Sequence, residues 1–323
     1  MDNDTFYIQL YDVTSIIALP LALIGLISNV FILYIFITDL FFHQPTYYLI
    51  MVAVISDIIT AITMTYGYSH ILARTVDSHG AHIMCQTAVF ITATSYTVSI
   101  MTICIIAIDR YFIVVKPWSP IYQQNKKRFL IISEILIWIM AAAVTAPLMA
   151  MMESKDKDYG LCDFVPITTS ISIYLVFLVL LVYIIPSFII IMTYSKIIMY
   201  WRSHISFNGD VANQRRIRNK MFIKTLMSIA LSYVLLTWPY FATILGYAIT
   251  KKSYFQLRHT NRPAYIVSLL SRTLTTSITI VSPFTYLQFD RDIRKRASII
   301  CKHLLCFHSR RTIRTARIRP VFE

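Results

Sequence analysis

The sequence contains little charge and little glycine for its length. Only 14% of its 323 residues are Asp, Glu, Lys or Arg and only 6 are Gly, whereas 57% are hydrophobic. Soluble domains of this size usually carry about 25% charged residues. So low a charge over so long a chain favours lipid, and not water, as the medium around most of the protein.

Cysteine is also scarce, which excludes several kinds of site. Five cysteines are too few for a scaffold of disulfides, and no CxxC pair or Cys/His cluster indicates a zinc site. The first residues, MDNDTFYIQLYD, lack the basic stretch that opens a cleaved signal peptide, so we expect the first hydrophobic run to act as a signal anchor. No paired nucleophile and base is visible, so no enzyme is predicted.

Long hydrophobic runs fill most of the chain. A membrane helix needs about 20 mainly apolar residues, and seven stretches meet that length. They are Val13–Thr38, Thr46–Tyr68, Met84–Ile113, Phe129–Met152, Thr168–Tyr200, Met221–Ile249 and Ala264–Leu287. We therefore predict an all-α membrane protein with a seven-transmembrane helix bundle over 13–288, a short extracellular tail (1–12) and a cytoplasmic part (289–323). The repeated halves and broken helices of a transporter are not seen.

The basic residues predict the orientation. Of the 30 Lys and Arg residues, 21 fall in the segments on one side of the spans and 7 on the other. Because cytoplasmic loops carry the excess of Lys and Arg, we expect the N-terminus outside and the tail in the cytoplasm, at the plasma membrane. The net charge of +14 then forms a rim that attracts anionic membrane lipid, is compatible with docking of an acidic partner, and does not indicate nucleic acid.

The third span carries the most informative motif. It ends in Asp109-Arg110-Tyr111, followed by Val114 and Pro117, which matches the DRYxxVxxP pattern of the rhodopsin-like (class A) G-protein-coupled receptors. Every other span adds a residue in a fitting place. These are Asn29, Asp57, Trp138, Pro147, Pro186, Tyr194, Tyr233, Trp238, Pro239, Pro283 and Tyr286. The chain thus resembles that family along its whole membrane part.

The resemblance implies roles for particular residues. Those for G-protein coupling and activation are Asp109, Arg110, Tyr111, Pro117, Trp118, Tyr194 and Tyr286. Those for the switch core are Asn29, Asp57, Ile100, Pro186, Tyr233, Trp238, Pro239, Ser282 and Pro283. The implied partners are an extracellular ligand and a heterotrimeric G protein, with arrestin and a receptor kinase.

The resemblance also implies accessory sites. Asp57 with Ser95 and Ser99 would bind a sodium ion, the alternative being a protonated, hydrogen-bonded Asp57. A disulfide would join Cys85 to Cys162. A short amphipathic eighth helix would carry palmitoylation sites at Cys301 and Cys306, the alternative being free thiols. Asn3 begins an Asn-Asp-Thr glycosylation sequon.

The sequence departs from the family pattern in three places. Ser282 replaces the usual Asn of NPxxY. Trp238 directly precedes Pro239, whereas the family has Trp two residues before the Pro, where this chain has Thr237. Asn219 stands where an acid at the inner end of the sixth span would hold Arg110. We therefore expect some basal activity.

Ligand-binding residues are predicted at the outer ends of the spans. Thr92 stands where amine receptors carry Asp, which argues against a monoamine, and Thr276 replaces the retinal-binding Lys of opsins. Arg272 shares a helical stripe with Thr276 about 12 Å below the outer end of its span. A guanidinium facing lipid at that depth is costly, so Arg272 would receive an acidic group, or else pair internally with Asp163 or Glu153.

The predicted ligand site consists of Thr92, Tyr96, Tyr240, Phe241, Arg272 and Thr276. A peptide is the first expectation for the ligand. A chemosensory, small acidic-metabolite or lipid ligand is the second, and a non-signalling scavenger receptor of the same fold is a further alternative.

Overall fold

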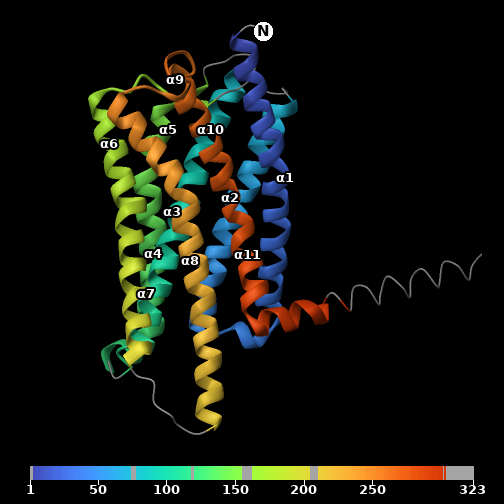
Figure 1. The fold of residues 1–323 in the computed structure, drawn as a ribbon, viewed down its shortest axis with the longest axis vertical. Helices are drawn as coiled ribbons and strands as arrows, with labels where there is room; N and C mark the ends of the chain where they lie inside the picture. Colours follow the sequence, from blue (N-terminus) through green and yellow to red (C-terminus); the bar gives the residue numbers. More distant parts are fainter. Residues whose placement is uncertain are drawn as a thin grey trace, which may run out of the picture.

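The computed structural model describes residues 3–73, 78–117, 120–154, 162–203, 210–300 and 302. Seven helical segments in this part are long and apolar enough to cross a membrane, and each overlaps one predicted span (Figure 1). They are Gln9–Thr38, Pro45–Ala73, Gly80–Val114, Gln124–Met151, Thr169–Ser203, Lys220–Thr250 and Arg262–Phe289. The predicted seven-helix bundle is confirmed. Trp118, Cys301 and Cys306 lie outside the described residues, as does the Asn3 side chain.

Some spans consist of one helix and others of several. The helices are α1 (Asn3–Thr38), α2 (Pro45–Ala73), α3 (Ser78–Val114), α4 (Pro120–Thr145), α5 (Pro147–Met151), α6 (Thr169–Val179), α7 (Ile185–Ser203), α8 (Asp210–Thr250), α9 (Tyr254–Thr260), α10 (Arg262–Thr276) and α11 (Ile278–Phe289), with a 3-10 turn η1 (Leu40–Phe42). A π-helical turn, η2 (Leu180–Ile184), joins α6 to α7. It lies directly before Pro186, whose ring clashes with the preceding turn of a regular helix.

A glycine allows α1 to approach α11 closely. A Cβ atom added to Gly25 would lie 2.8 Å from the Thr279 Cβ, a distance that real side chains do not reach. One turn further along α1, the Asn29 amide donates to the Thr279 carbonyl at 2.6 Å and to the Gly25 carbonyl at 2.8 Å. The approach thus positions α11, which carries Ser282, Pro283 and Tyr286, against the first span.

A disulfide and a short hairpin cover the end of the bundle opposite the Asp-Arg-Tyr motif. Strands β1 (Met152–Ser154) and β2 (Cys162–Phe164) pair antiparallel, with Glu153 opposite Asp163. Cys162 is bonded to Cys85 of α3, as expected, with the two Cα atoms 5.5 Å apart. The hairpin is therefore fixed to the third span above the interior of the bundle.

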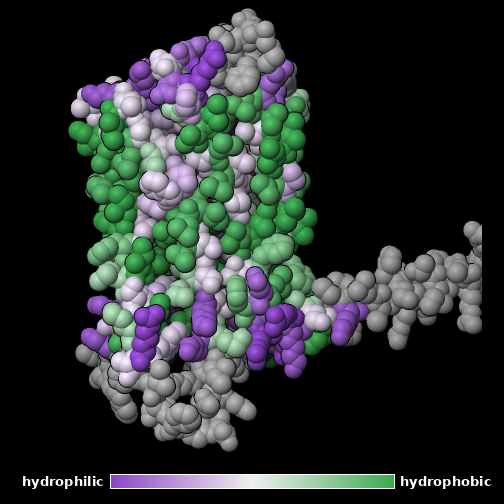
Figure 2. All heavy atoms as spheres, viewed as in Figure 1, coloured by the Kyte–Doolittle hydropathy of each residue, from purple (hydrophilic) through white to green (hydrophobic). Residues whose placement is uncertain are grey.

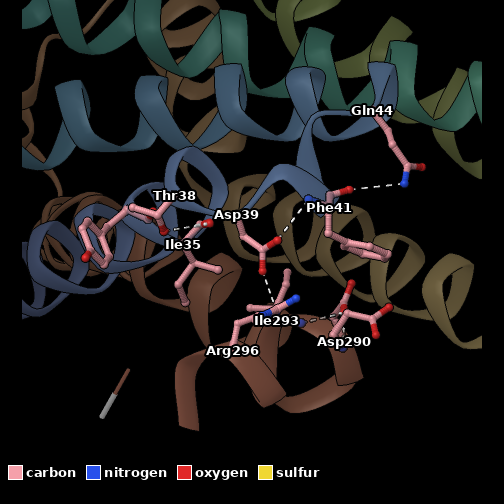
Figure 3. Close-up of polar contacts among 10 residues, drawn as sticks. Ile35, Thr38, Asp39, Phe41, Gln44, Asp290, Ile293 and Arg296 are labelled. Atoms are coloured by element: carbon pink, nitrogen blue, oxygen red, sulfur yellow. Dashed lines mark hydrogen bonds and ion pairs between the residues drawn. The ribbon is translucent and has the colours of Figure 1, made fainter. Parts of the chain in front are cut away.

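The surface divides into an apolar belt and two polar ends (Figure 2). At the end that carries Arg110, residues 291–300 form a further helix that runs across the bundle (Figure 1). Asp290 begins it by accepting from the Asp292 and Ile293 amides, and Arg296 forms an ion pair with Asp39 at 2.5 Å (Figure 3). Ile293 is fully buried in the main core. The predicted eighth helix is confirmed.

Candidate functional site

Three helices hold the carboxylate of the Asp-Arg-Tyr motif. Asp109 of α3 is fully buried. Its Oδ2 accepts from the Arg110 guanidinium at 2.7 Å and from the Thr46 hydroxyl of α2 at 3.2 Å. Its Oδ1 forms an ion pair with Lys126 of α4 at 2.6 Å. Sequence reasoning missed Thr46 and Lys126, because no motif or periodicity distinguishes them from neighbouring polar residues.

Arg110 has no acidic partner on the sixth span. The guanidinium also contacts the Thr46 hydroxyl, and it lies 5.3 Å from the centre of the Phe222 ring of α8. The described side chains of α8, residues 220–250, include no Asp or Glu. The sequence predicted that the sixth span offers Arg110 no acid, because Asn219 stands at the usual place. Residues 220–250 agree with that prediction.

Two tyrosines predicted for activation are buried near this end. Tyr194 of α7 is buried and its hydroxyl has no hydrogen-bond partner among the described residues. Tyr286 of α11 is also buried and packs its ring edge against Phe36, with centroids 6.3 Å apart. Tyr111 lies beside Lys196, whose Nζ is 5.8 Å from the ring centre. A buried phenol without a hydrogen-bond partner, at the end of the bundle that carries Arg110, is a group that a rearrangement can use.

A polar cluster surrounds Asp57 in the middle of the bundle. Ser99 of α3 donates to Asp57 Oδ1 at 3.0 Å, and the Ser282 hydroxyl of α11 is the second within reach of the carboxylate. Ser95 is buried one turn away on α3, about 6 Å along the axis, and its contact with a bound ion stays a prediction. Ser282 is an additional hydroxyl beside Asp57 that was not predicted as a ligand. A carboxylate and two hydroxyls are oxygen ligands that fit a hard cation.

An aromatic cluster lies between Asp57 and the outer end. Tyr96 of α3 contacts Tyr233 and Phe241 of α8 at centroid distances of 5.3 and 5.5 Å. Tyr183 of η2 stacks on Phe241 at 4.7 Å and donates to the Val234 carbonyl at 3.0 Å. Ile100 and Pro186 are buried beside this cluster. The cluster connects α3, η2 and α8 through ring contacts.

Trp238 does not belong to the interior. Its side chain is 58% exposed on the outer face of α8, whereas Thr237 is fully buried and donates to the Tyr233 carbonyl. Successive helical residues are rotated by about 100°, so a Trp directly before the Pro cannot take the interior direction that Thr237 takes. The assignment of Trp238 to the switch core is thus corrected: it faces the surroundings of the bundle.

A cavity of about 250 Å³ opens from the end covered by the hairpin. Five of the predicted ligand-binding residues line it: Thr92, Tyr96, Tyr240, Phe241 and Arg272. Thr276 does not. Its hydroxyl is buried between Tyr68 at 3.2 Å and Met64 at 3.3 Å, so it joins α10 to α2. The lining also includes four tyrosines that sequence reasoning missed, Tyr11, Tyr68, Tyr247 and Tyr254, and it includes Asp163, which was named only as a possible partner of Arg272.

The guanidinium of Arg272 meets phenols and no carboxylate in the described part of the chain. It donates to the Tyr11 hydroxyl of α1 at 3.2 Å, and its Cζ lies 5.5 Å from the Tyr11 ring centre. The expected alternative, an ion pair with Asp163 or Glu153, is not formed. Asp163 instead accepts from the Ser253 hydroxyl at 2.6 Å and from the Phe255 amide at 2.9 Å, at the start of α9.

The comparisons with known proteins agree with this arrangement. A sequence model of the 7 transmembrane receptor (rhodopsin family) matches residues 28–286, from within the first span to near the end of the seventh. This range contains the Asp-Arg-Tyr motif, the Asp57 cluster and the cavity residues other than Tyr11.

Several characterised receptors are similar at low identity. The tachykinin-like peptides receptor 99D of Drosophila melanogaster is 23% identical over 71% of this chain and 47% of that protein. The RYamide receptor of Tribolium castaneum is 25% identical over 67% of this chain and 63% of that receptor. The 5-hydroxytryptamine receptor 1B of Mus musculus is 26% identical over 57% of this chain and 48% of that receptor. The chain thus spans about half to just under two thirds of the length of these relatives.

Proposed function

Because the chain belongs to the rhodopsin family of seven-transmembrane receptors, we propose that it binds an extracellular peptide and activates a heterotrimeric G protein at the plasma membrane. The N-terminus would lie outside and residues 291–300 inside. The basic side chains support this orientation, since cytoplasmic segments carry the excess of Lys and Arg. Figure 2 shows hydrophilic side chains at both ends of the bundle, and the basic residues Arg291, Arg294, Lys295 and Arg296 belong to the end that carries Arg110.

One observation carries the proposal: the two ends of α3 serve two different sites within one packed interior. Near its outer end, Thr92 and Tyr96 line the cavity. At its inner end, Asp109 and Arg110 form a buried pair that contacts α2, α4 and α8. Between them lie the ring contacts of Tyr96 and the Asp57 cluster. A ligand in the cavity therefore touches groups that are continuous with the cytoplasmic pair.

The mechanism follows from two arrangements of Arg110. In the arrangement seen, Arg110 pairs with Asp109 and lies beside Phe222. A ligand that binds the alternative arrangement more tightly shifts the population toward it. Movement of α8 would remove Phe222 and release the guanidinium toward Tyr194 and an acidic or polar end of the G protein. Since α8 supplies no acid to oppose this movement in its described side chains, we expect measurable basal activity.

The Asp57 cluster fits a sodium ion in the resting arrangement. Asp57, Ser99 and Ser282 would supply oxygen ligands from three different helices. An ion held there would oppose relative movement of α2, α3 and α11. We expect sodium to lower agonist affinity in the unmodified receptor and to have no effect after Asp57→Asn. A sodium effect that survives this substitution would mean that sodium acts at another site, and no sodium effect in the unmodified receptor would agree with a protonated Asp57 that binds no ion.

The peptide assignment has two supports. The Drosophila relative is named for peptides, and Thr92 lines the cavity where an amine receptor would need an acid. The cavity is small, about 250 Å³, whereas sites for drug-sized ligands measure about 300–1,000 Å³. It would therefore hold one end of a peptide, with the rest on the hairpin and α9. The intact Asp109–Arg110 pair argues against a scavenger that does not signal.

The test uses cells that express the full chain with a panel of G-protein biosensors and a library of short synthetic peptides. We expect at least one peptide to activate a biosensor, and Arg110→Ala to lower that response at least tenfold while surface binding of the labelled peptide persists. Arg128→Ala, an exposed arginine of α4, is the matched control. An Arg110→Ala response equal to that of the unmodified receptor, or no active peptide, would contradict the proposal.

A further inference from the structure

The position of Arg272 raises the question of what balances its charge. Arg272 lies about ten residues inside α10, or about 15 Å at 1.5 Å per residue. It lines the cavity and belongs to a membrane span. Ionisable groups at such depth are costly and are usually paired or functional. A structural role would require a nearby acid within the protein.

The groups around Arg272 are neutral. Its recorded hydrogen bond in the described part of the chain goes to the Tyr11 hydroxyl. Two further phenols, Tyr68 and Tyr254, line the same cavity. A guanidinium has five N–H donors in a planar fork, so this single contact leaves most of its donors for a ligand. Neutral phenols orient the fork but do not neutralise it.

The two acids that also line the cavity are held elsewhere. Asp163 of β2 caps the start of α9, where its carboxylate accepts from the Ser253 hydroxyl and from the Tyr254 and Phe255 amides. Asp57 lies in the interior cluster with Ser99. Neither forms an ion pair with Arg272. The cavity therefore presents an arginine that the described protein does not neutralise, beside hydroxyl groups able to donate further hydrogen bonds.

We propose that Arg272, together with Tyr11, Tyr68 and Tyr254, forms a carboxylate-binding site that receives the acidic end of the ligand. The carboxylate comes from the C-terminus of a peptide or from a small carboxylic acid. A carboxylate matches the guanidinium fork with two parallel hydrogen bonds, and the phenols supply donors at its sides. The inference rests on the proposed receptor function, because it assigns a ligand group within the same cavity.

The test is a binding measurement that needs no G protein. The full chain is purified in lipid nanodiscs, and its unfolding temperature is measured with a library of short peptides prepared twice, as free acids and as C-terminal amides. A second set of probes contains small mono- and dicarboxylic acids. We expect acid forms to raise the unfolding temperature of the unmodified receptor more than their amides do. Stabilisation by the small acids, in place of the peptide acids, would identify the source of the carboxylate.

Variants then assign the preference to Arg272. We expect Arg272→Gln to bind the best acid probe at least tenfold more weakly, about what loss of a charged hydrogen bond causes, and to lose the preference for acid over amide. Arg272→Lys keeps the charge without the fork and should retain part of the affinity. Arg262→Gln makes the same change at the exposed first residue of α10 and should bind like the unmodified receptor.

The proposal fails if no acid probe stabilises the unmodified receptor, if amides bind as well as acids, or if Arg272→Gln keeps the preference. These outcomes are separate from the signalling test. A receptor that signals in response to an amide and ignores acids would retain the proposed function and overturn the carboxylate site. Acid binding without any biosensor response would support the carboxylate site and contradict the proposed signalling function.

Discussion

Arg110 and Arg272, at opposite ends of this bundle, have opposite surroundings. Arg110, at the end that carries residues 291–300, has Asp109 beside it, and Lys126 and Thr46 also contact that carboxylate. Arg272, at the cavity, has the neutral hydroxyl of Tyr11. One cation is balanced by the protein itself, and the other is not balanced by the described residues.

The difference indicates two uses of the same side chain. A charge that the protein neutralises contributes to the stability of the resting arrangement, and separating the pair changes the conformation. A charge that the protein leaves without a carboxylate costs stability in the absence of ligand, and that cost favours an anionic ligand. Stability measurements on the unliganded receptor can therefore distinguish the two ends.

The largest expected effect is that of Asp109→Asn. Arg110 and Lys126, both partly buried, would then lie side by side with no counter-charge from Asp109, and removing one partner of a fully buried pair costs about 3–5 kcal/mol, which is the upper bound here. We expect the unfolding temperature of the purified receptor to fall by several degrees. Asp292→Asn, on the helix over residues 291–300, is the control. If the unfolding temperature fell no more than in the control, the Asp109 pair would contribute nothing to stability, and the contrast between Arg110 and Arg272 would not hold.

Lys126→Met is expected to have the second largest effect. It removes one of the two cations that contact Asp109. Because the Lys126 side chain is 22% exposed, the free energy of unfolding should fall by about 1 kcal/mol. Basal G-protein signalling should also rise, since Arg110 then has a less firmly held partner. Lys127→Met changes the exposed neighbour and should alter neither quantity. Equal basal signalling in the two variants would exclude a role for Lys126.

Tyr11→Phe should have a smaller effect on stability. It removes the hydroxyl that accepts from Arg272, a bond worth about 0.5–1.5 kcal/mol net. The effect should vanish when Arg272→Gln is already present, which a double-mutant cycle measures directly. If Tyr11→Phe lowered stability equally with Arg272 present and with Arg272→Gln, the Tyr11 hydroxyl would act through another group.

Arg272→Gln by itself should cost no stability in the unliganded receptor. It removes a charge from the membrane interior that no described carboxylate balances, and such charges are unfavourable there. We expect the unfolding temperature to stay the same or to rise. A decrease comparable with that of Asp109→Asn would reveal an internal acidic partner and would remove the contrast between the two arginines.

Much of this architecture could be predicted from the sequence. Seven apolar runs, the Asp109-Arg110-Tyr111 motif and the Cys85–Cys162 pairing all agree with the structure. The placement of Arg272 at a cavity also follows from its helical stripe. The partners could not be predicted, because contacts such as Lys126 with Asp109 or Tyr11 with Arg272 join residues that no local pattern relates. Trp238 was assigned inward because of the resemblance, although its place beside Pro239 turns it outward.

The amino-acid sequence alone determines that this protein spans a membrane seven times, since the length and apolarity of each run must match the thickness of the lipid core. It also determines which helix ends carry charged motifs. Only the tertiary structure decides which charges are balanced. Whether a charged side chain reaches an opposite charge depends on the distance between neighbouring helices. That distance is set by packing at other positions, such as the close approach of Gly25 to Thr279.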